Sequence, residues 1–215
     1  MGLRASLRAL TVIAAVSAVG YLSVIATDSV DARPARVVDA LIDTDALAAT
    51  AQPKELRLAQ PPAEQEMSLV RVRGEAALGS FAYDWRAGLP NWEISFHPGR
   101  SGVLGYTFVQ EQRIEVYVRD EMSDQLLAHV IAHEIGHAID VSNNSGDDRR
   151  RWQELREIED APWWPTSGAT DFSTGAGDFA ESFAAWQVGD ASFRSRVADP
   201  PSAAENELMA ELVSG

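Results

Sequence analysis

Hydrophobic and polar residues alternate clearly in one segment of the first half of the chain. In "RIEVYVR", residues 113–119, every second residue is an isoleucine or a valine and the others are charged or tyrosine, which is the period of a half-buried strand. Residues 91–99 and 102–112 predict two further strands, the first closed by a Pro-Gly turn. Residues 67–85 begin with alternation and continue with small residues, so a strand or a short helix is expected there.

Longer apolar segments with helical spacing follow in the second half of the chain. Ser123 is expected to cap a helix that runs to about Val141. Further helices are predicted over residues 147–160 and from Asp178 to Gly189, separated by a long loop. Because strands come first and helices later, we expect an α+β fold in which a short mixed sheet is followed by several helices.

The N-terminal residues have the pattern of an export signal. Arg4 and Arg8 precede an uncharged run from Ala9 to Thr27, as the basic and apolar regions of a signal peptide do. We therefore expect residues 1–27 to be a signal peptide, cut near Ala26, or an N-terminal membrane anchor. The protein would then be extracytoplasmic, either secreted or anchored to the cell membrane.

Composition divides the rest of the chain into a linker, a domain and a tail. Residues 28–67 are rich in alanine, proline and charge, which is typical of a linker. The folded domain is expected over residues 68–200, and residues 201–215 are expected to be a C-terminal tail or a short helix. We expect this domain to be a monomer.

Charge and cysteine content exclude some classes of function. The net charge of −14 argues against a nucleic acid held through its phosphates. The chain has no cysteine, which excludes a disulfide framework and a thiolate metal site.

Three of the four histidines lie in "LLAHVIAHEIGHAIDV", residues 126–141. His133 and His137 are four residues apart, so on a helix both imidazoles lie on one face and can reach one metal ion. With Glu134 between them they form the H-E-x-x-H pattern, in which two histidines bind Zn²⁺ and the glutamate is the general base of a hydrolase. In the alternative interpretation the two histidines are satisfied core residues. His129, one turn earlier, is interpreted as a core or supporting histidine.

A catalytic zinc ion needs a third protein ligand. Asp140 follows His137 by one turn, but its side chain would point along the helix, so we interpret it as a group that supports the ligands or the helix end. The other candidates are Asp178 and Glu181 in "GDFAESFAAW". Glu181 is predicted to be the ligand because it stands among small and apolar residues. Asp178 is the alternative, although its place at the expected helix start suits a cap.

The segments "HEIGHAID" and "FAESFA" together resemble the compact gluzincin proteases of the anthrax lethal factor and Pro-Pro endopeptidase type, over roughly residues 92–188. The resemblance implies a small zincin-like domain and a zinc-dependent endopeptidase. It implies His133, His137 and a helical glutamate as ligands to Zn²⁺, with Glu134 as the base that activates water against a peptide bond.

The resemblance also implies how a substrate binds. An extended peptide or protein would dock along residues 113–119 by adding a strand. Those proteases place a tyrosine shortly before the ligand glutamate to steady the oxyanion, whereas this chain has no tyrosine after Tyr117 and has Phe172 at the approximate position. A catalytically weak or inactive zinc-binding module that interacts with peptides or proteins is therefore the alternative function. A structural or adhesion protein with core histidines is the third.

Overall fold

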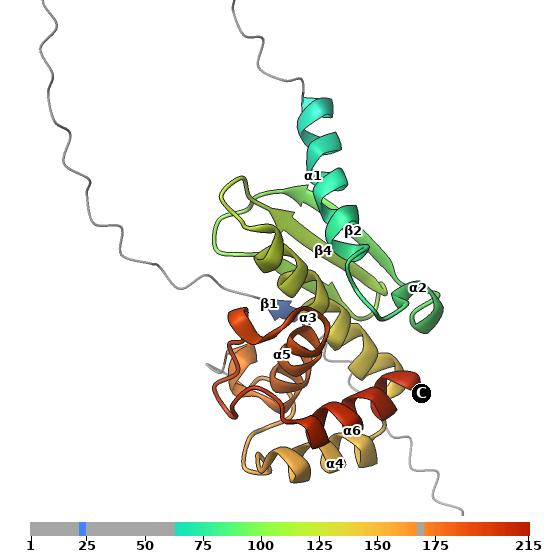
Figure 1. Ribbon diagram of the computed structural model, residues 1–215, viewed down its shortest axis with the longest axis vertical. Helices are drawn as coiled ribbons and strands as arrows, with labels where there is room; N and C mark the ends of the chain where they lie inside the picture. The colour runs from blue at the N-terminus through green and yellow to red at the C-terminus, as the bar shows by residue number, and fades with distance from the viewer. Residues whose placement is uncertain (1–21, 25–62, 167–169) are drawn as a thin grey trace, which may run out of the picture.

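The computed structural model of the chain describes residues 22–24, 63–166 and 170–215 (Figure 1). The predictions for most of the export signal and of the linker lie outside the described residues. Among the residues described, no helix combines the length and the apolar character that crossing a membrane requires. The fold is α+β, as the order of strands and helices predicted.

Among the described residues, four strands form one mixed sheet. They are β1 (Leu22–Val24), β2 (Glu93–Pro98), β3 (Gly105–Phe108) and β4 (Arg113–Val118), in the order β1-β3-β4-β2. The strands β2 and β4 are parallel, and β3 is antiparallel to both β4 and β1. The three strands expected between residues 91 and 119 are thus confirmed. The strand β1 lies within the residues for which a signal peptide or anchor was expected.

The place of β4 corrects the prediction of how a peptide docks. Because β4 lies between β3 and β2, residues 113–119 have no free edge to which a strand could be added. The prediction that a peptide pairs with this segment is therefore wrong. The outer edge of β3 carries Leu22–Val24 in antiparallel register.

Two helices lie between β1 and β2 along the chain. Residues 67–85, for which a strand or a helix was expected, form most of α1 (Ala63–Leu78) and lead to the short α2 (Trp85–Gly88). The helix alternative is therefore correct, and α1 packs beside β2.

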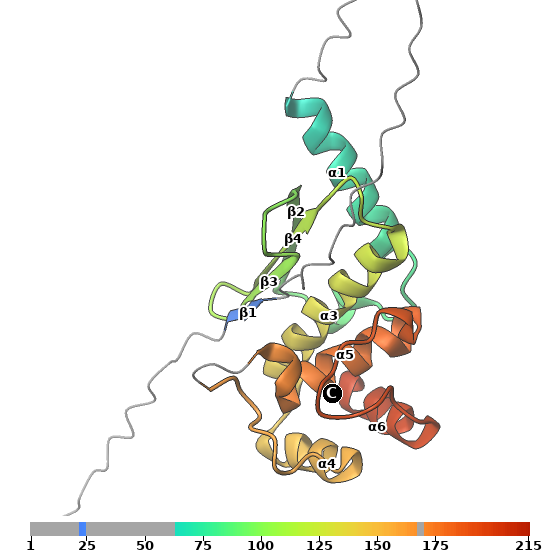
Figure 2. The ribbon, with the colours of Figure 1, turned by 90° about the vertical axis from the view of Figure 1, so that its left-hand side faces the viewer.

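The long helix α3 (Asp124–Asn143) is the centre of the fold. Ser123 caps it as predicted, because its side chain accepts a hydrogen bond from the backbone N–H of Leu126. One side of α3 packs against the sheet, where Ile114 and Val116 are completely buried. Its other side packs against α5 (Gly175–Val188), so that α3 lies between the sheet and the later helices (Figure 2).

The remaining helices cover the far end of α3. They are α4 (Gly146–Arg156) and α6 (Ala203–Ser214), with the 3₁₀ turns η1 (Asp171–Ser173) and η2 (Asp190–Ser192) before and after α5. The helix α5 begins three residues earlier than expected. Its N-cap is Thr174, which accepts a hydrogen bond from the N–H of Gly177, so the prediction that Asp178 caps this helix is wrong.

A glycine allows α3 and α5 to approach closely. A Cβ atom at Gly136 would lie only 2.8 Å from the Cα of Ala180, so any larger residue would push the two helices apart. This contact brings the face of α3 that carries His133 and His137 close to the start of α5.

Candidate metal centre

His133 and His137 point in the same direction from α3, as their spacing predicted. Both are completely buried, and their Nε2 atoms lie 3.1 Å apart. The ring of Phe172 packs edge-on against His133, with 5.7 Å between the ring centroids. Two imidazole nitrogens therefore converge on one buried point.

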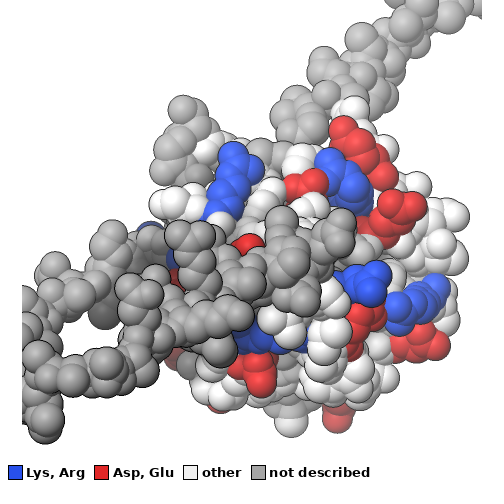
Figure 3. Space-filling model, turned by 90° about the horizontal axis from the view of Figure 1, so that it is seen from above, with Lys and Arg blue, Asp and Glu red and all other residues white. Residues whose placement is uncertain are grey.

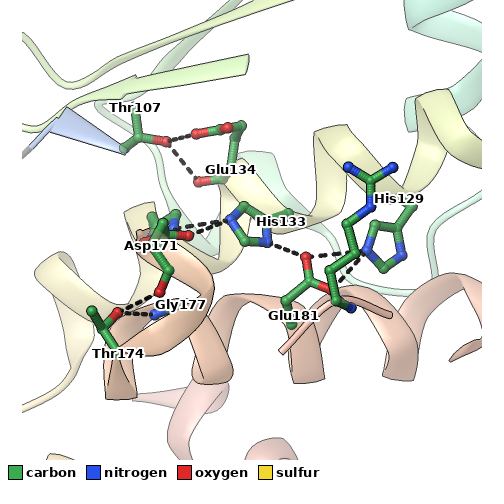
Figure 4. A network of polar contacts seen from close by, with 10 residues as sticks. Thr107, His129, His133, Glu134, Asp171, Thr174, Gly177 and Glu181 are labelled. Atoms are coloured by element: carbon green, nitrogen blue, oxygen red, sulfur yellow. Dashed lines mark hydrogen bonds and ion pairs between the residues drawn. The ribbon is translucent and has the colours of Figure 1, made fainter. Parts of the chain in front are cut away.

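Asp171 completes the group of converging side chains. Its Oδ2 atom lies 3.0 Å from Nε2 of His133 and 3.2 Å from Nε2 of His137. All three residues are buried, and their ligating atoms lie within 4.8 Å of one another, so they could hold a metal ion. Figure 4 shows Asp171 pointing toward His133. Sequence reasoning missed Asp171 because it lies in what was interpreted as a long loop. One signal was present, since Asp171 is the only acidic residue of 161–177.

The turn that carries Asp171 is held by the start of α5. The hydroxyl of Thr174 donates to the carbonyl oxygen of Asp171 at 2.7 Å, and accepts from the N–H of Gly177 at 3.0 Å. A Cβ atom at Gly177 would lie 2.1 Å from that same carbonyl oxygen, so only a glycine fits there. Thr174 and Gly177 thus both cap α5 and fix the turn that positions the carboxylate of Asp171.

Glu181 lies on the opposite side of His133. Its Oε1 atom is 2.7 Å from Nδ1 of His133, and its Oε2 atom is 3.2 Å from Nε2 of His129. Oε2 also accepts a hydrogen bond from the backbone N–H of Arg194. The assignment of Glu181 as a metal ligand stays a prediction, and in this arrangement Glu181 meets the Nδ1 atom whereas Asp171 meets the Nε2 atoms.

Asp178 faces a different part of the fold. Its carboxylate is completely buried and accepts two hydrogen bonds from Arg156, each at 2.9 Å. It also accepts from Nε1 of Trp152 at 3.1 Å and from the hydroxyl of Ser195 at 2.7 Å. Both oxygens of Asp178 are therefore engaged in a buried ion pair that joins α4 to α5.

Asp140 supports the end of α3 and the loop that follows. It accepts a hydrogen bond from Nε of Arg149 at 2.9 Å and another from Nε1 of Trp163 at 3.0 Å. These contacts agree with the interpretation of Asp140 as a supporting residue.

Glu134 lies next to the converging side chains and is itself completely buried. Its Oε2 atom accepts a hydrogen bond from the hydroxyl of Thr107 at 2.6 Å, and its Oε1 atom has no hydrogen-bond partner among the described residues. Burial raises the pKa of Glu134 to about 7, although the charges of His133 and His137 and the Thr107 hydroxyl act to lower it. A carboxylate with a pKa near neutrality can both accept and release a proton.

The charges of the site compensate one another. Burial acts to lower the pKa of His133, but hydrogen bonds to Asp171 and Glu181 raise it to about 10. Burial acts to raise the pKa of Asp171, yet the two histidines hold it well below its usual range. For Glu181, burial is likewise outweighed by His129 and His133, which lower its pKa to about 2. A positive charge at the centre of this group is therefore favourable.

No protein-family model matches the chain, and no curated protein or solved structure matches it. The fold and the site therefore define the class by themselves. The protein is a small α+β protein with a buried His-His-Asp group, built on a His-x₃-His helix, that could hold a metal ion.

Proposed function

We propose that the protein is an exported zinc-dependent endopeptidase in which His133, His137 and Asp171 hold Zn²⁺. The observation that carries the proposal is the convergence of three ligating atoms, from α3 and from η1, directly beside the carboxylate of Glu134. Two imidazoles and one carboxylate are a donor set that suits zinc in a catalytic site, where a fourth position stays open. A zinc ion bound there would supply Lewis-acid chemistry and lower the pKa of water toward about 7.

Glu134 is the proposed general base. It takes a proton from the attacking water and gives it to the nitrogen of the leaving amine, as its pKa of about 7 allows. Because its Oε1 atom has no hydrogen-bond partner among the described residues, one oxygen is available for this transfer.

Glu181 has a different role in this proposal from the one that the sequence suggested. Its Oε1 atom lies 2.7 Å from Nδ1 of His133, close enough to keep the ring proton on Nδ1 and so leave the Nε2 lone pair for the metal, as carboxylates behind ligating histidines do. The contact of Glu181 with His129 and with the backbone of Arg194 fixes the carboxylate in that orientation. Asp171 then takes the ligand position.

The proposed substrate is an extended peptide or an unstructured protein. The outer edge of β3 accepts an antiparallel strand, since Leu22–Val24 pairs there opposite Tyr106–Phe108. This edge adjoins the site, because Thr107 contacts Glu134. An extended peptide that replaced Leu22–Val24 would therefore pass close to Glu134.

The surface charges favour a protein partner over a nucleic acid. On the face seen in Figure 3, acidic and basic side chains of the described residues lie side by side, without a continuous basic patch. Together with the net charge of −14, this pattern argues against binding to phosphates.

A zinc-binding module without catalysis is the second candidate. It is favoured by Phe172, an apolar ring that packs against His133 where the resembling proteases place a tyrosine. Zinc content and hydrolysis of an unstructured protein by the full chain separate the two functions. The endopeptidase should bind about one zinc per chain and cleave, and the module should bind zinc and not cleave. A chain that binds no zinc excludes both.

A further inference from the structure

We infer that Thr107 and Gly105 of β3 position the carboxylate of Glu134, so that the sheet itself holds the catalytic base. This inference rests on the proposed function, because it assigns two positioning residues to that reaction. Both residues are on β3, whereas Glu134 is on α3, so the base is held from outside its own helix. Figure 4 shows the contact of Thr107 with Glu134.

Thr107 fixes one oxygen of the base. It is completely buried, and its Oγ1 atom lies 2.6 Å from Oε2 of Glu134 and 3.1 Å from the carbonyl oxygen of the same residue. A hydroxyl has one proton to donate, and an ionised carboxylate is the stronger acceptor. The short contact is therefore the one that matters for the base. A threonine side chain also has few rotamers, so its hydroxyl keeps its orientation even without the contact to Glu134.

Gly105 makes room for the other oxygen. It precedes Thr107 by two residues and therefore lies on the same face of β3, toward α3. A Cβ atom at Gly105 would lie 2.5 Å from Oε1 and 2.8 Å from Cδ of Glu134. A methyl group at Gly105 would displace the carboxylate. The space above Gly105 and the hydroxyl of Thr107 therefore together define one position for the carboxylate of Glu134.

The support of these two residues is rigid. Gly105 pairs with Val116 and Thr107 pairs with Ile114 of β4, and both partners are completely buried. The position of the strand is thus fixed by the core of the protein. Precise placement of a base matters because a displacement of about 1 Å can cost roughly 100-fold in rate.

A purely structural role for Thr107 predicts a different outcome, and matched variants of the full chain separate the two. Thr107→Val keeps the shape and removes the hydroxyl, whereas Thr107→Ser keeps the hydroxyl. Tyr117→Phe is the control, because it removes a hydroxyl that donates to Glu115 within β4, on the face of the sheet opposite to Ile114 and Val116.

The measurements are kcat, KM and zinc content with an unstructured protein as substrate. Thr107→Val and Gly105→Ala should lower kcat by roughly 10- to 100-fold, with KM and zinc content close to those of the wild type. Thr107→Ser should recover most of the loss, and Tyr117→Phe should behave as the wild type. A wild-type kcat in Thr107→Val, or a loss that serine does not reverse, would overturn the inference.

Crystal structures of the same variants test the positioning apart from catalysis. In Thr107→Val and in Gly105→Ala the carboxylate of Glu134 should leave its wild-type position. If it stays in place, the inference is wrong whether or not the protein is a peptidase. If it moves but the wild-type chain with bound zinc cleaves nothing, the positioning stands and the proposed function fails.

Discussion

Nδ1 of His133 lies 2.7 Å from Oε1 of Glu181, while Nε2 of the same ring lies 3.0 Å from Oδ2 of Asp171. One imidazole is therefore held between two buried carboxylates that come from opposite sides. Only the Nε2 atom of His133 lies next to the second histidine, His137, and only Asp171 lies on that side of the ring. The two carboxylates therefore have different functions. Asp171 is suited to a ligand, and Glu181 to the residue that orients the ring.

The first prediction separates these roles by zinc affinity. Asp171→Ala removes a proposed ligand and should lower the affinity more than any change at Glu181. Glu181→Gln keeps an oxygen that can accept from Nδ1–H, so its loss should be roughly 10- to 100-fold or less, as for other residues behind the ligands. Competition with a chromogenic chelator measures both. If Glu181→Gln loses the metal and Asp171→Ala keeps it, then Glu181 is the ligand, as the sequence suggested.

The second prediction concerns the base. Glu134→Gln should retain zinc and lose hydrolysis by roughly 10²- to 10⁴-fold, because the amide cannot accept the proton of the attacking water. His137→Ala is the matched control and should lose zinc and activity together. The readouts are metal content and the rate of cleavage of an unstructured protein. Full activity in Glu134→Gln would show that the proposed mechanism is incorrect.

The third prediction is that zinc affinity rises with pH. In the metal-free protein the pKa of His133 is about 10, so near neutral pH this ring carries a proton that zinc must displace. Below that pKa the apparent affinity should increase by about tenfold per pH unit for the one proton released. Titrations at several pH values measure the slope, and proton release into an unbuffered solution measures the proton directly.

A variant of Glu181 provides the control for the pH dependence. The carboxylate of Glu181 helps to raise the pKa of His133, so Glu181→Gln should lower that pKa and flatten the slope near neutral pH. An affinity that does not change with pH in the wild type would contradict the assignment of a protonated His133.

The fourth prediction concerns the stability of the fold. Arg156 and Asp178 form a buried ion pair, so removing Arg156 leaves the carboxylate of Asp178 without its counter-charge. Arg156→Met should cost about 3–5 kcal/mol in the free energy of unfolding. Asp178→Asn should also cost more than the roughly 1 kcal/mol of a lost helix cap. Urea unfolding of the full chain measures these costs.

An exposed pair in the same helix is the matched control. Arg150 and Asp147 form an ion pair on the surface of α4, with side chains that are 65% and 80% exposed. Arg150→Gln should therefore change the stability by less than about 1 kcal/mol. Equal costs for Arg150→Gln and Arg156→Met would show that burial does not decide the strength of these pairs.

The sequence predicted those elements whose residues carry a regular period. The alternation in β4 and the capped helix α3 were both recognisable, because packing on one face imposes a period of two or of 3.6 residues. His133 and His137 followed directly from the same argument. Their convergence is a property of one helix and needs no knowledge of the rest of the fold.

Asp171 could not be found in this way. It lies in a turn, where no period relates neighbouring residues, and it reaches the histidines only because α5 packs closely on α3 at Gly136. The start of α5 was also misjudged, because the Thr174 cap precedes three small residues that resemble a loop. The sequence therefore identified an acidic residue near the site, but the choice between Asp171 and Glu181 depends on tertiary packing.

The separation of Asp171 from the two histidines along the chain has a mechanical consequence. Asp171 follows His137 by 34 residues, so a metal ion bound by both would close a loop that contains all of α4. The chain has no cysteine, so the ion would be the cross-link of this loop, as disulfides are in many exported proteins. Because zinc binds the folded state alone, each tenfold increase of free zinc above its dissociation constant should add about 1.4 kcal/mol to the free energy of unfolding. Chelation should accordingly lower the melting temperature of the wild type and leave that of His137→Ala unchanged.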